Sequence, residues 1–170
     1  KNKKSVEESL VELISKIGEK ITIRRSKFFD KKGSNFSYVH NSSEKNIGKV
    51  ISIVKIEGED QATLKELGIK LAMHVAASSP IAIDESGIDK EILNKELEII
   101  KEELKNSGKK DEMIEKISKG KLQKFISDNT LINQIWIMDT KKKVKDILKS
   151  NSGKQIKVLE FVRFKVGEGV

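Results

Sequence analysis

The stretch IKLAMHVAASSP at residues 69–80 predicts a helix that ends at Pro80, the only proline in the chain. Small apolar residues crowd the last turns of this helix. A second stretch, FVRFKVGEG at residues 161–169, alternates large apolar and charged residues and then reaches glycines. That alternation is typical of a half-buried strand followed by a turn. Together the two stretches predict a small α+β domain.

The composition restricts the class of protein. A chain of 170 residues suits one domain or two small subdomains, and a compact fold of this size buries roughly 70% of its unfolded surface. The sequence contains no cysteine, which excludes a disulfide framework, a thiol nucleophile and a zinc–thiolate site. No apolar run approaches the ~18 residues that span a bilayer, and no signal peptide is evident. We therefore expect no membrane partner and a cytoplasmic location.

The net charge of +8 makes nucleic acid a candidate partner. The positive excess is spread over residues 1–4, 24–32 and 141–145, and aromatic residues make up only 5% of the chain. A protein that binds single strands needs aromatic platforms beside its basic groove. We therefore expect a solvated surface that pairs with an acidic protein partner or stays near ribosomes, and no specific nucleic acid.

Hydrophobic periodicity and turn residues divide the chain into helices and strands. A capping-box pattern from Ser5 to Glu8 opens the first helix, and Gly18 ends it. The expected strands cover residues 21–29, 35–40, 47–56 and 156–166. Further helices are expected at residues 61–78, 88–106 and 144–148. Another is expected from residue 111 onwards, with a bend or close packing at Gly120.

Two of these helices predict a hairpin. Leu93, Leu97, Ile100 and Leu104 step by four, three and four residues, which is the spacing of a coiled-coil seam. A short turn separates this helix from the next one, so the two should lie antiparallel. We expect an antiparallel two-helix coiled-coil arm at about residues 88–126 that contacts a partner or a second copy.

A weak internal repeat predicts two subdomains. Residues 13–23 and 148–158 both read as helix, glycine and strand, with Gly18 and Gly153 at the same spacing. The expected fold class is α+β, with two subdomains of antiparallel sheet and packed helices plus the inserted arm. Residues 1–60 form the partial N-terminal core subdomain, and residues 61–170 form the C-terminal core subdomain that contains the arm.

No catalytic constellation is evident. A phosphate-binding loop needs glycines and a lysine followed by Ser or Thr, and the sequence has none. His40 and His74 lie on separate elements without metal-ligand spacing, so we expect no metal, no cofactor and no enzymatic activity. His74 falls on a strip with Glu66 and Lys70 along the outer face of its helix. We expect a solvent-facing side chain that is either ordinary surface or a contact for another protein.

Short motifs recur in a fixed order along the chain. They read IGEKITIRR at 17–25, SYVH at 37–40, IGKV at 47–50, AMHVAASSP at 72–80 and KGKLQKF at 119–125, followed by the tail at 161–169. Together they resemble the core and dimerisation domain of the elongation factor Ts family. One departure is Gln134-Ile135-Trp136, where that family usually has Gln-Pro-Phe, although an aromatic residue is kept.

The resemblance implies a guanine-nucleotide exchange factor of translation elongation. Such a factor binds the GTPase elongation factor Tu and promotes GDP release by binding alone, and some members of the family form homodimers. The positions that meet the GTPase in the family correspond here to Ile47, Gly48, His74, Ile137 and Met138. Gly48 would permit close backbone approach, His74 would be a polar anchor, and the three others would make apolar contacts. The alternative for Ile47, Ile137 and Met138 is an ordinary place in the core.

Two features of the family are not found in these residues. They are an N-terminal ubiquitin-associated-like domain and a Thr-Asp-Phe-Val segment that intrudes near the Mg²⁺ site of the GTPase. We therefore expect a fragment that binds the GTPase but exchanges its nucleotide poorly. The alternative function, from a different class, is a basic RNA- or ribosome-associated adaptor domain.

Overall fold

The computed structural model describes residues 3–30, 32–150 and 156–168. Its helices are α1 (Val6–Ile17), α2 (Gln61–Ser78), α3 (Lys90–Asn106), α4 (Asp111–Asn129) and α5 (Val144–Ser150). Its strands are β1 (Ser34–Glu44), β2 (Ile47–Glu57), β3 (Ile135–Trp136), β4 (Asp139–Lys143) and β5 (Lys157–Lys165). Short 3₁₀ turns occupy Glu85–Gly87 and Leu131–Asn133.

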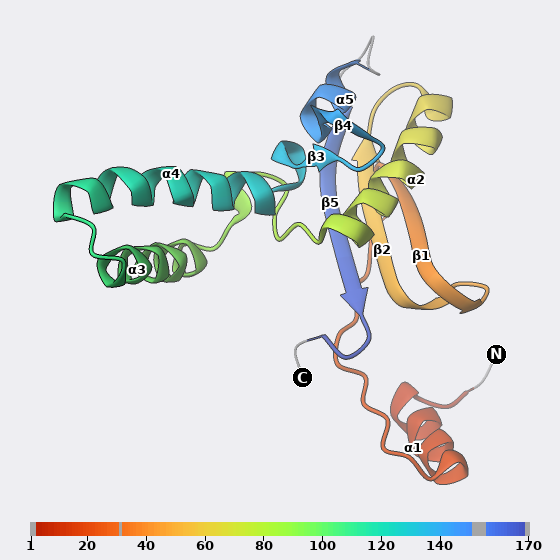
Figure 1. The fold of residues 1–170 in the computed structure, drawn as a ribbon. Helices are drawn as coiled ribbons and strands as arrows, with labels where there is room; N and C mark the ends of the chain where they lie inside the picture. Colours follow the sequence, from red (N-terminus) through yellow and green to blue (C-terminus); the bar gives the residue numbers. More distant parts are fainter. Residues whose placement is uncertain (1–2, 31, 151–155, 169–170) are drawn as a thin grey trace.

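The centre of the molecule is an antiparallel sheet in the order β1-β2-β5, with α2 lying across one face (Figure 1). Alternate residues of β2, such as Val54 and Ile56, point towards α2 and meet its buried Leu64, Leu71 and Val75. β3 and β4 form a separate two-stranded sheet beside α5. The predicted α+β class with antiparallel sheets is therefore confirmed.

The bounds of α2 follow from its end residues. Asp60 caps the first turn because its carboxylate accepts a hydrogen bond from the Ala62 N–H at 3.1 Å. Ser79 adopts the left-handed conformation at the other end, directly before Pro80, so the helix cannot continue. The predicted helix over residues 61–78 is confirmed.

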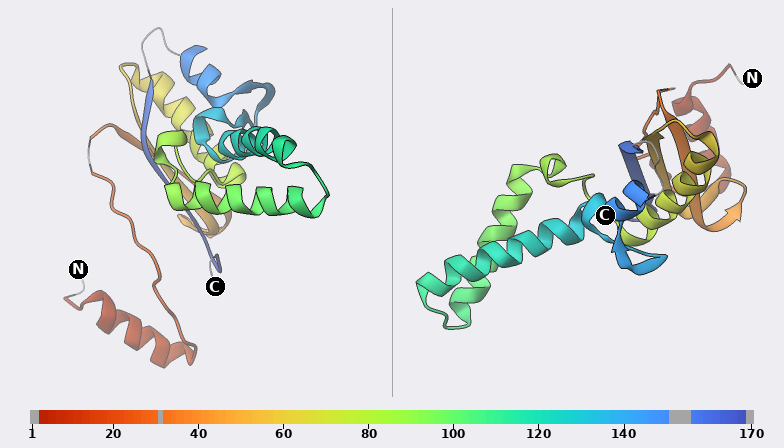
Figure 2. Two further views of the ribbon diagram at one scale, coloured as in Figure 1. Left: turned by 90° about the vertical axis from the view of Figure 1, so that its left-hand side faces the viewer. Right: turned by 90° about the horizontal axis from the view of Figure 1, so that it is seen from above.

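Helices α3 and α4 form a hairpin that projects from the sheet, as the views from two further directions also show (Figures 1 and 2). They pack through two small clusters that are separate from the main core. Near the base the cluster contains Ala82, Ile88 and Ile126, and further out it contains Ile100, Leu104 and Ile114. The two-helix arm is present, while its coiled-coil character stays a prediction.

Two details of the arm differ from the expectation. α3 begins at Lys90, since Asp89 caps it by accepting from the Glu91 N–H at 2.9 Å. α4 runs through Gly120 without a break, and a Cβ added there would meet nothing within 4 Å. The predicted bend or close packing at Gly120 is wrong, because the other residues of the segment favour the helix.

The strand predicted over residues 21–29 is not formed. The segment crosses the sheet face that is opposite to α2 and is held by side chains instead of a backbone ladder. The guanidinium of Arg25 lies 4.8 Å from the centre of the Phe164 ring, and Lys55 binds Asp30 at 2.8 Å. A strand needs an adjacent edge to pair with, and the described strands pair only in the orders β1-β2-β5 and β3-β4, without these residues.

Helix α1 lies away from the sheet, and none of its residues is buried (Figure 1). Its predicted ends are confirmed: the Ser5–Glu8 capping box is formed, and Gly18 follows in the left-handed conformation at φ 75°. Gly153, the other glycine of the repeat, lies outside the described residues. The domain boundary at residue 60 stays a prediction, and strands from its two sides, β2 and β5, pair in one sheet.

None of the described helices is both long enough and apolar enough to cross a membrane.

Candidate protein-contact site

His74 is completely buried, so the predicted solvent-facing side chain is wrong. The loop at residues 135–138, with Gln134 directly before it, covers this turn of α2. The Trp136 ring stacks on the imidazole with the ring centres 5.2 Å apart, and Gln134 Oε1 lies 3.0 Å from Nε2. Burial lowers the pKa of His74 below its usual value, although the hydrogen bond to Gln134 opposes this shift. A neutral imidazole therefore holds the loop.

Gln134 joins three elements at the base of the arm. Its side-chain nitrogen donates to the carbonyl oxygens of Ser78, at 3.2 Å, and Asp128, at 2.7 Å. Both amide protons are then used, so Oε1 accepts from His74 Nε2–H. The other ring nitrogen, Nδ1, accepts from the backbone N–H of Ile137 at 3.4 Å. One glutamine thus connects the ends of α2 and α4 to the loop.

The loop presents apolar side chains on its outer side. Ile137 and Met138 are 40% and 43% exposed, and Ile135 is exposed as well. The alternative that Ile137 and Met138 belong to the core is therefore wrong. Beside Ile137, a cleft of about 240 Å³ is lined by Tyr38, His40, Met73, Ala76 and Ala77. The loop and this cleft form a continuous surface that is suited to apolar contact.

Ile47 and Gly48 lie elsewhere, at the start of β2. The Ile47 side chain is 57% exposed, so the core alternative is wrong for it too. A Cβ on Gly48 would lie 2.5 Å from Val39 Cγ1 and 2.7 Å from the His40 carbonyl oxygen. The close approach that requires glycine at this position is therefore made by β1 of the same chain.

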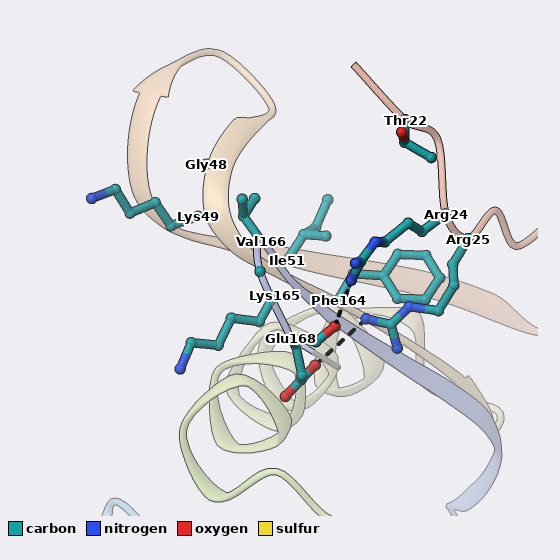
Figure 3. Close-up of a pocket in the computed structure, with 11 residues that line it drawn as sticks. Thr22, Arg24, Arg25, Gly48, Lys49, Ile51, Phe164, Lys165, Val166 and Glu168 are labelled. Atoms are coloured by element: carbon teal, nitrogen blue, oxygen red, sulfur yellow. Dashed lines mark hydrogen bonds and ion pairs between the residues drawn. The ribbon is translucent and has the colours of Figure 1, made fainter. Parts of the chain in front are cut away.

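Gly48 also lines a second cleft, of about 450 Å³, on the face of the sheet opposite to α2 (Figure 3). We call this the basic cleft. It is lined by three segments: Thr22, Arg24 and Arg25; Gly48, Lys49 and Ile51; and residues 164–168. The two clefts share no lining residue. The structure therefore places the five predicted contact residues in two regions. His74 lies beneath the loop that carries Ile137 and Met138. Ile47 lies at the start of β2, next to Gly48, which lines the basic cleft.

Arginines surround the one carboxylate of the basic cleft. Arg163 binds Glu168 at 2.7 Å and Arg25 does so at 3.6 Å, while Arg24 donates to the backbone oxygen of Glu168 at 3.3 Å. Arg163 and then Arg25 hold the pKa of Glu168 below its usual value. The sequence analysis missed this cleft, although the pair Arg24-Arg25 and the charged tail at 165–168 could have indicated it.

The described residues contain no group of three histidines or carboxylates that could hold a metal ion. Every buried side-chain nitrogen and oxygen among them has a hydrogen-bond partner. The loop and the two clefts are therefore surfaces whose buried polar side chains are held in place by hydrogen bonds.

Comparisons with known proteins agree with the motifs. The profile of the family described as Elongation factor TS matches residues 1–168. The chain is 37% identical, over 99% of its length, to the elongation factor Ts of Rickettsia bellii (strain OSU 85-389). It is 40% identical, over 98% of its length, to that of Nitrobacter hamburgensis.

These alignments cover 57% of the Rickettsia protein and 56% of the Nitrobacter protein. The chain thus spans a little over half the length of the curated relatives that it matches. The family match nonetheless extends over nearly all of its 170 residues, and the chain belongs to the elongation factor Ts family.

Proposed function

We propose that this chain acts in translation elongation by binding elongation factor Tu and promoting the release of GDP. The observation that carries the proposal is the exposed apolar loop at 135–138, which the buried His74, Gln134 and Trp136 hold in one conformation. A surface that is ordered before binding loses less conformational entropy when a partner docks. Membership of the elongation factor Ts family supplies the identity of the partner.

The proposed action needs no bond-making chemistry. A protein that binds the GTPase more tightly without nucleotide must weaken nucleotide binding by the same factor, because the two equilibria are linked. An acceleration of about ten-thousandfold would correspond to roughly 5.5 kcal/mol of differential binding. The loop is proposed to supply binding, and the expectation that the chain exchanges nucleotide poorly stays a prediction.

The test compares an exposed apolar residue of the loop with a matched residue of α2. Met138→Ala should weaken binding to nucleotide-free elongation factor Tu by about 2 kcal/mol if Met138 is a central contact. Ile69→Ala on α2 removes an apolar side chain of similar exposure, 41%, and should leave the affinity within about twofold. Isothermal titration measures both, and equal losses would contradict the assignment of the loop.

A salt titration separates the proposal from an RNA-binding role. Binding to RNA weakens linearly with the logarithm of salt concentration, since phosphate contacts release counterions. We expect a shallow dependence for elongation factor Tu, because the loop is apolar. Tight, steeply salt-dependent binding to RNA without affinity for elongation factor Tu would overturn the proposal.

A further inference from the structure

The hydrogen bonds around His74 determine which nitrogen of its ring carries the proton. Gln134 donates its amide hydrogens to two carbonyl oxygens, at 2.7 and 3.2 Å, so its Oε1 accepts from Nε2–H of His74 at 3.0 Å. The other ring nitrogen, Nδ1, is then unprotonated, and the backbone N–H of Ile137 donates to it at 3.4 Å. The closed loop at 135–138 therefore requires a neutral imidazole.

A second proton on the ring would disrupt these contacts. It would bind to Nδ1, where the new N–H would face the N–H of Ile137, and two donors cannot form a hydrogen bond with each other. The ring is completely buried, so the positive charge would also lie away from water. The face of Trp136 attracts a cation, but it cannot replace the lost acceptor for Ile137. Protonation therefore favours a conformation in which Ile137 has moved away and the ring meets water.

No opposite charge compensates a proton on His74. Among the described residues, no carboxylate forms a salt bridge or hydrogen bond with the ring, whose polar contacts are Gln134 and the Ile137 N–H. The strand β2 meets α2 through Ser52 and through apolar side chains such as Val54. Burial accordingly lowers the pKa of His74, and the hydrogen bond to Gln134 opposes this shift.

The charged and titratable side chains on the elements around this part of α2 are engaged elsewhere or are cations. Asp128 on α4 is exposed and reaches the site through its backbone oxygen, while Lys165 on β5 is itself a cation. The others pair with one another, namely Lys70 with Glu66 on α2, Tyr38 with His40 on β1, Arg163 on β5 with Glu168, Asp139 with Lys142 on β4, and Asp146 on α5 with the Lys143 N–H. None of these groups is placed to stabilise a charged His74.

We propose that His74 is an acid-sensitive switch: protonation of its ring releases residues 135–138 and removes the contact surface that they present. His74 and Trp136 hold the tip of the loop, whereas Gln134 is also bonded to the ends of α2 and α4. The base of the loop can therefore stay in place when the tip is released. The release is a property of this chain alone, and its effect on partner binding rests on the proposed function.

Linkage between protonation and release sets the size of the effect. In the released state His74 meets water, so its pKa lies near the ordinary value of about 6.5, whereas in the closed state its pKa is lower. The population of the released loop therefore rises by up to about tenfold for each pH unit below about 6.5, until the pH reaches the closed-state pKa. The loop stays closed above about pH 7.

The experiment uses Trp136, the only tryptophan of the chain, which is 4% exposed. Acidification from about pH 7.5 to pH 4.5 should shift its fluorescence to longer wavelength, because release exposes the indole to water, while the helical circular dichroism stays unchanged. His40, the only other histidine, contacts Tyr38 and supplies the matched control. His40→Gln should keep the fluorescence transition, and His74→Gln should lose it.

Three results would overturn the switch: no transition in the unaltered chain, a transition that persists in His74→Gln, or one that appears only with loss of the helical signal. If His74→Gln does not fold, NMR of the unaltered chain supplies the test. The ring protons of His74 should titrate with the same midpoint at which the protection factor of the Ile137 amide falls. Different midpoints would equally overturn the switch.

Binding measures the consequence separately. Between about pH 7 and pH 5, the affinity for elongation factor Tu should fall about tenfold more for the unaltered chain than for His74→Gln. A fluorescence transition with the same pH dependence of binding in both chains would support the switch and contradict the loop as the contact in the proposed function. No binding by the unaltered chain at any pH would overturn the proposed function, while the fluorescence would still decide the switch.

Discussion

The Nε2 atom of His74 lies 3.0 Å from Oε1 of Gln134, and this buried hydrogen bond joins two residues that are sixty positions apart in the chain. Through it α2 holds the loop that carries Ile137 and Met138. The same glutamine side chain donates to the ends of α2 and α4, so the loop, the central helix and the base of the arm share one polar connection. Buried polar networks of this kind stabilise one conformation as long as every member is satisfied.

Gln134→Ala should destabilise the fold by about 2–4 kcal/mol, because it removes three hydrogen bonds and leaves buried partners unsatisfied. Gln123→Ala, at an exposed position of α4, is the matched control and should stay within about 0.5 kcal/mol. Urea unfolding followed by circular dichroism measures both values. Similar midpoints for the two variants would show that the Gln134 contacts contribute little.

Acid should weaken the fold through His74. Its pKa is lowered in the folded state, so the unfolded chain binds the proton more readily. The contribution of His74 is therefore complete above the unfolded value, about pH 6.5, and declines as the pH falls through the lower folded value. The free energy of unfolding should decrease between about pH 7 and pH 5, and His74→Gln should flatten this decrease.

The range from about pH 7 to pH 5 separates the titration of His74 from that of the acidic groups. Asp30, Glu160 and Glu168 have lowered pKa values because they pair with Lys55, Lys27 and Arg163, so they lose their contributions at more acidic pH. A slope that is unchanged in His74→Gln would assign the pH dependence to another group.

Two glycines within helices should respond in opposite ways to alanine. A Cβ on Gly68 would lie 2.1 Å from Cδ2 of Phe36, where α2 packs on β1, so Gly68→Ala should cost about 1–3 kcal/mol. Gly120 has open space around it, and Gly120→Ala should stabilise α4 by about 0.5–1 kcal/mol. Thermal unfolding of both variants tests the packing. Phe36→Leu should recover part of the loss in Gly68→Ala, and no recovery would place the strain elsewhere.

Local signals in the sequence were sufficient for some elements and not for others. The bounds of α2 were predictable because Asp60 and Pro80 act within one turn of the helix ends. The strand expected at 21–29 has suitable residues, but a strand also needs a partner edge, which local periodicity does not show. The observed segment is held by contacts such as Arg25 with Phe164 instead.

The candidate site, too, was only partly predictable from local sequence. Ile137 and Met138 were predictable as contact candidates from the family motif, but the burial of His74 was not. The side chains of Glu66 and Lys70, which share its strip, are 72% and 43% exposed, so the helical pattern predicts an exposed histidine. The loop that covers His74 comes from distant residues and reaches only that part of the strip. The residues that cover this turn of α2 are distant in the chain, so the spacing of residues along α2 does not indicate that His74 is buried.

The burial of His74 changes its expected role from a direct contact to a positioning residue. His74→Ala removes the stacking on Trp136 and the acceptor for the Ile137 N–H, so residues 135–138 should lose their fixed conformation. Ordering the exposed side chains of that loop again on binding costs about 0.5–1.5 kcal/mol each. Affinity for elongation factor Tu should therefore fall about tenfold, and amide exchange across the loop should accelerate.

The control for that prediction is a substitution that lowers stability without touching the loop. Ile114→Ala opens a cavity in the outer cluster of the arm and should cost about 2–5 kcal/mol of stability while leaving the affinity nearly unchanged. In a double-mutant cycle, His74→Ala and Met138→Ala should be non-additive, because both act through the same loop. Additive losses, with unchanged amide exchange in His74→Ala, would mean that His74 meets the partner directly after a rearrangement of the loop.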